Sequence, residues 1–263
     1  SNPALLRGII DELQSVADQV PPGKDRWSLR TYLADAIQKA GQPDQSLTLY
    51  DQAAAEAQAA EHWSDVAWIC GHWANSLRKC VQLDASRAKF MESADASRKA
   101  GDPEVNVVGR ELEVLRIDVM QGRAEAVLPE IESRLDRVRQ WWRQTLAGQR
   151  VPAAPDAVFL GRALIGGLDV ARKANRALER WQACLDLLGE IAEIKKQLGE
   201  SPHERARTRF NQYGPLIRLG RLDDAQQVLE QCLPTFRDAN DLTNESKVLG
   251  ALADVWDNRG DTA

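Results

Sequence analysis

Polar and aromatic side chains recur at helical spacing in several segments of the chain. Trp68, His72, Asn75 and Lys79 follow one another by three or four residues, so they share one face of a helix within about 40°. Earlier and later segments repeat this pattern, and one later copy begins at Lys247. The stripe residues that we predict to contact a partner are Tyr32, Asp35, Lys39, Trp68, His72, Asn75, Lys79, Arg207, Asn211 and Arg218.

These residue types suit the binding of a peptide. An asparagine can donate to and accept from a peptide backbone, and lysine and arginine bind carboxylates. The stripes therefore favour a protein or peptide partner, such as one with acidic groups. The alternative is a merely solvated face, which every amphipathic helix has. Trp68 on an otherwise polar stripe favours binding.

The other residues that could carry chemistry form no catalytic or metal-binding pattern. His62, His72 and His203 are scattered and lack the HExxH spacing of a zinc protease. Gly23-Lys24 lacks the upstream glycine and the following Ser or Thr of a phosphate-binding loop. No stretch combines a nucleophile, a base and oxyanion donors. We therefore expect no enzyme activity, no catalytic residue, no metal site and no cofactor.

The cysteines indicate a reducing compartment. Cys70, Cys80, Cys184 and Cys232 occur singly in apolar helical patterns, with no CxxC pair. A free cysteine behaves as a small hydrophobic residue, so we expect buried thiols and neither disulfides nor zinc. No apolar run approaches the roughly 18 residues that a membrane span needs. We expect a cytoplasmic protein that does not enter a membrane.

Charge argues against nucleic acid as a partner. The formal net charge is -5, which disfavours binding to a polyanion over the whole surface. Two arginine clusters interleave with aromatic residues, one around Trp141-Trp142 and one around Phe210 and Tyr213. Such clusters can grip phosphates and stack on bases, but arginine stems also commonly cover apolar helix flanks.

A repeat of 40 residues determines how the chain is organised. Ala34 recurs as Ala74, Ser46 as Ser86, Tyr50 as Phe90 and Ala53 as Ser93. A fixed period of this length is typical of stacked helical repeats. The apolar spacing predicts an all-α chain in which helices lie about 27–40 and 43–60, 63–81 and 84–100, 107–120 and 123–140, 157–173 and 176–198, 203–219 and 222–238, and 243–258.

This pattern predicts one continuous solenoid. Residues 1–23 form a leading cap helix, 24–140 hold repeats one to three, 141–156 are an irregular insertion, and 157–263 hold repeats four to six, the last incomplete at Asp261. Small residues at helix crossings let the backbones approach, and an aromatic residue one turn later fills the space between pairs. Each pair then covers an apolar flank of the next.

Two segments resemble tetratricopeptide (TPR) repeats. They are Leu219-Gly220-Arg221-Leu222-Asp223-Asp224-Ala225 and Leu249-Gly250-Ala251-Leu252-Ala253-Asp254-Val255-Trp256. The triplets Ser46–Tyr50–Ala53, Ala177–Trp181–Cys184 and Ala225–Leu229–Cys232 resemble the small–large–small pattern of that family's second helix. The period exceeds the common 34 residues and resembles the long-helix subclass of bacterial regulators and kinesin-light-chain-like proteins. HEAT-like arrays of helix pairs remain the alternative.

The resemblance implies a TPR-like right-handed superhelix whose first helices line a concave face. On this basis we expect a non-catalytic scaffold that binds a peptide or partner protein in its groove, as part of a larger multidomain protein. The alternative is a structural, self-associating or regulatory sensor module, in which Trp141-Trp142 or the incomplete last repeat mediates a homo-oligomer.

Overall fold

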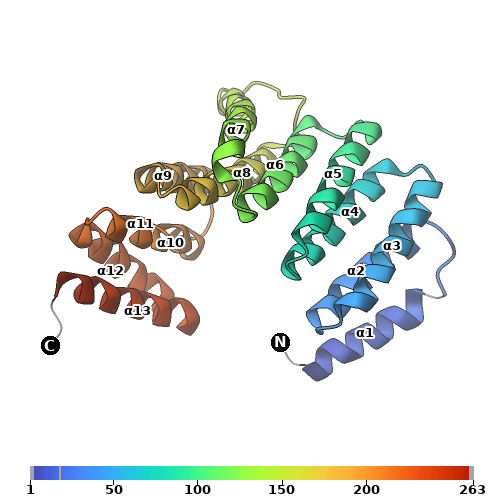
Figure 1. Ribbon diagram of the computed structural model, residues 1–263, viewed down its shortest axis with the longest axis horizontal. Coiled ribbons are helices and arrows are strands. Elements are labelled where there is room, and N and C mark those ends of the chain that lie inside the picture. Colours follow the sequence, from blue (N-terminus) through green and yellow to red (C-terminus); the bar gives the residue numbers. More distant parts are fainter. Residues whose placement is uncertain (1–2, 18, 261–263) are drawn as a thin grey trace. The chain divides into compact units, whose positions relative to one another are not determined.

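The computed structural model describes residues 3–17 and 19–260, and within these ranges the chain is helical and contains no strand (Figure 1). The predicted all-α solenoid fold class is confirmed. The described residues divide into two compact units, one of residues 1–121 with 152–154 and one of 122–151 with 155–263. Ser1, Asn2 and Asp18 of the predicted cap helix, and Asp261 of the predicted final turn, lie outside the described residues.

The first unit consists of helices that pack against their neighbours in the sequence. Turns of a few residues join them, so consecutive helices run antiparallel. The closest packing is between α4 and α5, α2 and α3, and α5 and α6. The helices are α1 (Pro3–Ala17), α2 (Lys24–Lys39), α3 (Pro43–Ala59), α4 (Trp63–Lys79), α5 (Leu83–Ala100) and α6 (Glu104–Met120).

The second unit is built in the same way, with α7 against α8, α8 against α9, and α12 against both α10 and α13. Trp142 of α7 is buried beside Gly161 of α8, where an added Cβ would lie 3.2 Å from the indole. Trp142 therefore packs inside this unit. The helices are α7 (Ala124–Leu146), α8 (Ala157–Ala177), α9 (Trp181–Gln197), α10 (Pro202–Phe210), α11 (Tyr213–Arg218), α12 (Leu222–Asp238) and α13 (Leu242–Arg259).

Small residues occupy the fourth position of α3, α5, α9 and α12. These residues are Ser46, Ser86, Cys184 and Ala225, each at most 1% exposed. Four residues later a large side chain fills the core, and none of the four is more than 2% exposed: Tyr50, Phe90, Leu188 and Leu229. The predicted small–large order therefore recurs in both units.

Side-chain hydrogen bonds at these crossings also repeat between the units. Ser93 Oγ donates to the carbonyl of Ala67 at 2.6 Å, and Cys232 Sγ lies 3.5 Å from the carbonyl of Ala206. Both pairs are 26 residues apart. The donors reach carbonyls of the first helix of the same pair, so the two units share one construction rule.

The predicted boundary between α8 and α9 is wrong. Ala177 and Trp181 were expected in one helix with Cys184, but Ala177 ends α8 and Trp181 begins α9. The buried Asn175 side chain donates to the carbonyl of Ala171 at 2.9 Å, and no glycine or proline interrupts the helix before this point. The core triplet of α9 is therefore Cys184, Leu188 and Ile191, all buried.

The predicted single helix over 203–219 is also wrong, because it is divided into α10 and α11 around Asn211-Gln212. Pro215 lacks an N–H to donate to the carbonyl of Asn211, and its ring crowds that carbonyl. Gly214 immediately before it lowers helix propensity further. The break lies four residues before the proline, as this account requires.

Turns between helices pass through one residue in the left-handed region. After α2 this residue is Gly41, with φ 85°, and after α4 the equivalent residue is Val81, with φ 61°. Both turns close with a backbone hydrogen bond to the helix, from Gln42 to Ile37 and from Gln82 to Leu77. A β-branched residue is strained in this conformation, whereas glycine is not.

We predict that Val81→Gly raises the free energy of unfolding by about 1 kcal/mol, because the left-handed conformation costs a side chain roughly 1–2 kcal/mol and glycine's larger unfolded-state entropy offsets part of the gain. Val81 is 75% exposed, so little packing is lost. Urea denaturation measures the change. The matched control, Gly41→Val, should lower stability, and a destabilised Val81→Gly variant would contradict this account of the turn.

Candidate interaction surface

In the first unit, α2 and α4 bring several predicted stripe residues into contact. Asp35 Oδ2 lies 2.8 Å from His72 Nδ1. The Tyr32 and Trp68 rings meet edge to face with centroids 5.5 Å apart, and the Trp68 and His72 rings are 4.7 Å apart. The stripes of two first helices, 40 residues apart in sequence, therefore form one surface.

Asp35 also ties this surface to the second helix of the pair, because the Tyr50 hydroxyl of α3 donates to its carboxylate. Burial by itself would raise the pKa of Asp35, but the hydrogen bonds from His72 and Tyr50 and the charge of Lys39 outweigh burial and lower it. Burial and the neighbouring Asp35 raise the pKa of Tyr50. Asp35 is thus ionised at neutral pH and accepts hydrogen bonds from both partners.

The remaining predicted residues of this unit differ in their freedom. Asn75 donates to the carbonyl of Gly71 and accepts from Arg78, so its amide is already engaged within α4. Lys39 and Lys79 are exposed and make no ion pair with any described residue. The lysines are therefore the cations that this surface offers to a partner.

In the second unit, Arg207 and Asn211 lie on a polar cavity of about 320 Å³, called here the α10–α13 cavity. Its other lining residues are Lys195, Glu204, Thr208, Phe210, Asn244 and Lys247. Glu204 accepts from Arg207 at 2.9 Å, and this hydrogen bond lowers the pKa of Glu204. Lys247, at the start of a predicted stripe copy, is exposed and unpaired among the described residues.

Arg218 lies on a different cavity, of about 380 Å³, called here the arginine cavity. Arg172, Arg176 and Trp181 line it from α8 and α9, and Tyr213 and Arg218 line it from α11. Asn211 and Phe210 line both cavities. The predicted stripe of this unit therefore spans two adjoining cavities.

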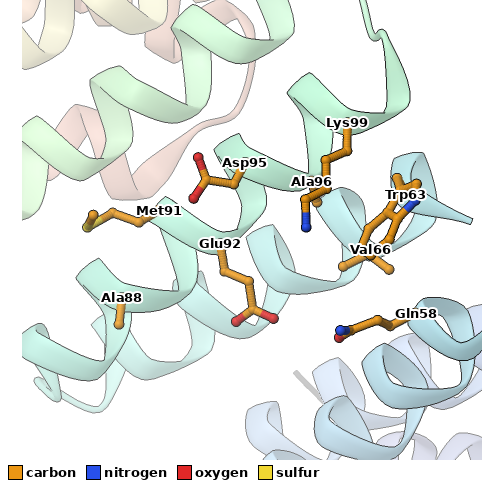
Figure 2. A pocket seen from close by; sticks show the side chains of 9 residues that line it. All are labelled: Gln58, Trp63, Val66, Ala88, Met91, Glu92, Asp95, Ala96 and Lys99. Carbon is orange, nitrogen blue, oxygen red and sulfur yellow. The ribbon is translucent and has the colours of Figure 1, made fainter. Parts of the chain in front are cut away.

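A further pocket of about 380 Å³ in the first unit contains none of the predicted residues (Figure 2). It lies between α3, α4 and α5, and Figure 2 shows Lys99 beside the Trp63 ring. The Lys99 ammonium is 4.4 Å from the ring centroid. Its two carboxylates are paired, Glu92 with Lys89 and Asp95 with Arg98, so this pocket offers no free charge of either sign from these groups.

Three of the four cysteines are buried free thiols, as predicted, but Cys80 is only half-buried because it lies at the exposed end of α4. Burial raises the pKa of Cys70 to about 12 and that of Cys232 to about 11. The described ranges contain no group of three or more His, Cys, Asp or Glu placed to hold a metal ion. None of the described helices is long and apolar enough to cross a membrane.

Comparison with known proteins identifies the fold. No protein-family model matches the sequence, and no curated protein matches it. The structure of BtubC (BKLC) from P. vanneervenii matches with a TM-score of 0.65 and 15% identity over 91% of each chain. A variant of the putative kinesin light chain nearly identical TPR-like repeats from Podosopora anserina matches with 0.60 and 16%, over 82% of this chain and 97% of that one. Apo RapI matches with 0.58 and 12%, over 98% and 72%.

The chain has a TPR-like fold. At these identities the likeness concerns architecture, and it confirms the predicted resemblance to TPR repeats at that level. In a TPR-like pair the first helix and second helix have distinct roles, and here the second helices carry the small–large core pattern. The predicted stripes lie on the first helices α2, α4, α10 with α11, and α13.

Sequence reasoning missed several residues of this TPR-like surface, namely Arg172, Arg176, Trp181, Lys195 and Asn244. The first two were overlooked because α8 was expected to end near 173. Extending α8 to Ala177 places Arg172 and Arg176 four residues apart on its last turns. That spacing, next to the tryptophan that opens α9, was the available signal.

We predict that Asp35→Asn lowers the free energy of unfolding by about 1–3 kcal/mol at neutral pH, because Tyr50 and His72 lose a charged acceptor. The folded-state pKa of Asp35 lies below its ordinary value of 3.8. Its stabilisation is therefore present above that pH and is lost as the pH falls through the folded value. His72, Tyr50 and Lys39 face it and share this dependence.

Urea denaturation of both proteins at neutral pH and near about pH 3 tests this coupling. The difference between wild type and Asp35→Asn should shrink on acidification. Tyr50→Phe, which removes one donor and leaves the carboxylate, should cost less. A difference that is equal at both pH values would show that the charge of Asp35 contributes nothing.

Proposed function

We propose that this TPR-like chain is a non-catalytic scaffold that binds an acidic peptide, or an acidic segment of a partner protein, through the stripes of its first helices. The neighbours in fold support a protein-interaction role in general. Free buried thiols favour a reducing compartment such as the cytoplasm.

One observation carries the sign of the partner's charge. Asp35 and Glu204 are the carboxylates of the α2–α4 surface stripe and the α10–α13 cavity, and both already have intramolecular partners. Lys39 and Lys79 in one unit and Lys247 in the other have none among the described residues. The charge left for a partner on these surfaces is therefore positive, although the chain as a whole carries -5.

The aromatic residues add an apolar component to the α2–α4 surface. Tyr32 is 53% exposed and packs edge to face on the half-buried Trp68. Two rings held in contact lose little side-chain entropy when a partner docks, and aromatic residues are enriched where binding energy concentrates. Lysines beside these rings then favour acidic residues flanking an apolar anchor.

Fluorescence anisotropy with labelled peptides of equal length tests the proposal. Peptides selected from a random library are resynthesised with each Glu and Asp changed to Gln and Asn, or to Lys. We expect the acidic versions to bind at least about tenfold more tightly than the neutral ones, with affinity falling as salt rises. Equal affinity for acidic, neutral and basic versions would refute the proposal.

Variants assign the binding to the stripes. Asn75→Ala with Lys79→Ala tests the first unit, and Arg207→Ala with Lys247→Ala tests the second. At least one pair should weaken the acidic peptide about tenfold or more. The matched control removes two exposed cations elsewhere, Arg150→Ala with Lys196→Ala, and should change affinity little. Unchanged affinity in both test pairs, with circular dichroism unaltered, would remove the stripes from the account.

A further inference from the structure

The arginine cavity has a composition unlike the other cavities. It is lined from α8 by Arg172 and Arg176 and from α11 by Arg218, and no carboxylate is among its lining residues. The α10–α13 cavity, by contrast, contains Glu204, and the pocket of Figure 2 contains Glu92 and Asp95. Three guanidinium groups therefore converge on a space of about 380 Å³.

The three arginines differ in how far their charge is balanced. Arg172 donates to Asp169 at 2.6 Å, and Lys173 shares the same carboxylate at 3.0 Å. Arg176 and Arg218 are exposed and form no hydrogen bond or ion pair with any described residue. The cavity thus presents two uncompensated positive charges, each on a planar group suited to bidentate contact with an oxyanion.

The rest of the lining is aromatic and uncharged. The Arg218 guanidinium lies 5.9 Å from the centroid of the Trp181 ring, and the Phe210 and Tyr213 rings lie 5.1 Å apart at 36°. Cys184 is 1% exposed, and burial raises the pKa of its thiol although Arg172 and Arg176 oppose that rise. An anion alone would leave these rings without a partner, whereas an anion carried on a flat apolar group would contact both parts.

We propose that the arginine cavity binds a phosphoryl group carried on an aromatic ring, which in a peptide partner is a phosphotyrosine side chain. A phosphoryl group carries about -1.5 to -2 charge at neutral pH, which matches the two unbalanced arginines. A carboxylate supplies only one negative charge, and a phosphoserine supplies no ring for Trp181, Phe210 and Tyr213. This inference rests on the proposed function for the ligand being part of a peptide.

Phenyl phosphate tests the cavity without any peptide. Its dissociation constant is measured by isothermal titration or ligand-detected NMR, beside inorganic phosphate and phenol. We expect phenyl phosphate to bind at least about tenfold more tightly than either. If it fails to bind at up to about 10 mM, or binds no more tightly than inorganic phosphate, the proposal is wrong.

Variants of exposed residues identify the groups responsible. Arg176→Ala with Arg218→Ala should weaken phenyl phosphate about tenfold or more, and the corresponding double change to Lys should weaken it less, because the charge remains and the fork is lost. Trp181→Ala should reduce the preference for phenyl phosphate over inorganic phosphate. The control Arg150→Ala with Lys196→Ala should leave it unchanged, and an equal loss in the control would refute a specific site.

A final comparison separates this inference from the proposed function. A phosphotyrosine peptide should bind more tightly than the same peptide with phosphoserine or with unmodified tyrosine. If phenyl phosphate binds as described but no acidic peptide binds the stripes, the cavity stands and the scaffold proposal fails. If acidic peptides bind the stripes while phenyl phosphate does not bind, the scaffold proposal stands and this inference fails.

Discussion

Neighbouring helices of this chain approach one another across small side chains at the fourth position of the second helices. Ser46, Ser86, Cys184 and Ala225 are all buried there, and a large side chain follows one turn later in each helix. A larger residue at the crossing would hold the backbones apart and open space around the large residue that follows. In a close-packed interior neither change is absorbed cheaply. The pairing of helices therefore depends on this small–large order.

The polar surfaces follow from that constraint. Because the second helices supply the core pattern, the first helices are left to present polar residues, and the crossing geometry determines which of these meet. Asp35 and His72 come from different pairs, yet the contact between their helices brings them to 2.8 Å. The same construction rule in the second unit brings Arg176 and Arg218 to one cavity. Recognition in this account is thus a by-product of how pairs are packed.

The sequence predicted the helix pairs well where the 40-residue period holds, because matched residues such as Ala34 and Ala74 mark equivalent crossings. It failed at Ala177, where a buried asparagine side chain extends α8, and at Asn211, where Pro215 breaks a helix from four residues away. It predicted the stripe residues but not their partners. Whether Asp35 meets His72, or Arg176 meets Arg218, depends on the rotation of one helix relative to another, which periodicity within a single helix does not contain.

The most direct test of the crossing rule is the effect of Ala34→Leu and Ala74→Leu on the free energy of urea-induced unfolding. Both alanines are fully buried, and Ala74 packs against Phe90 and Ile117. Overpacking should cost about 1–3 kcal/mol at each site, whereas a leucine at the exposed Ala60 should cost little. If both core variants unfold at the same urea concentration as the wild type, small side chains are not what permits the helices to pack, and the account of the fold is contradicted.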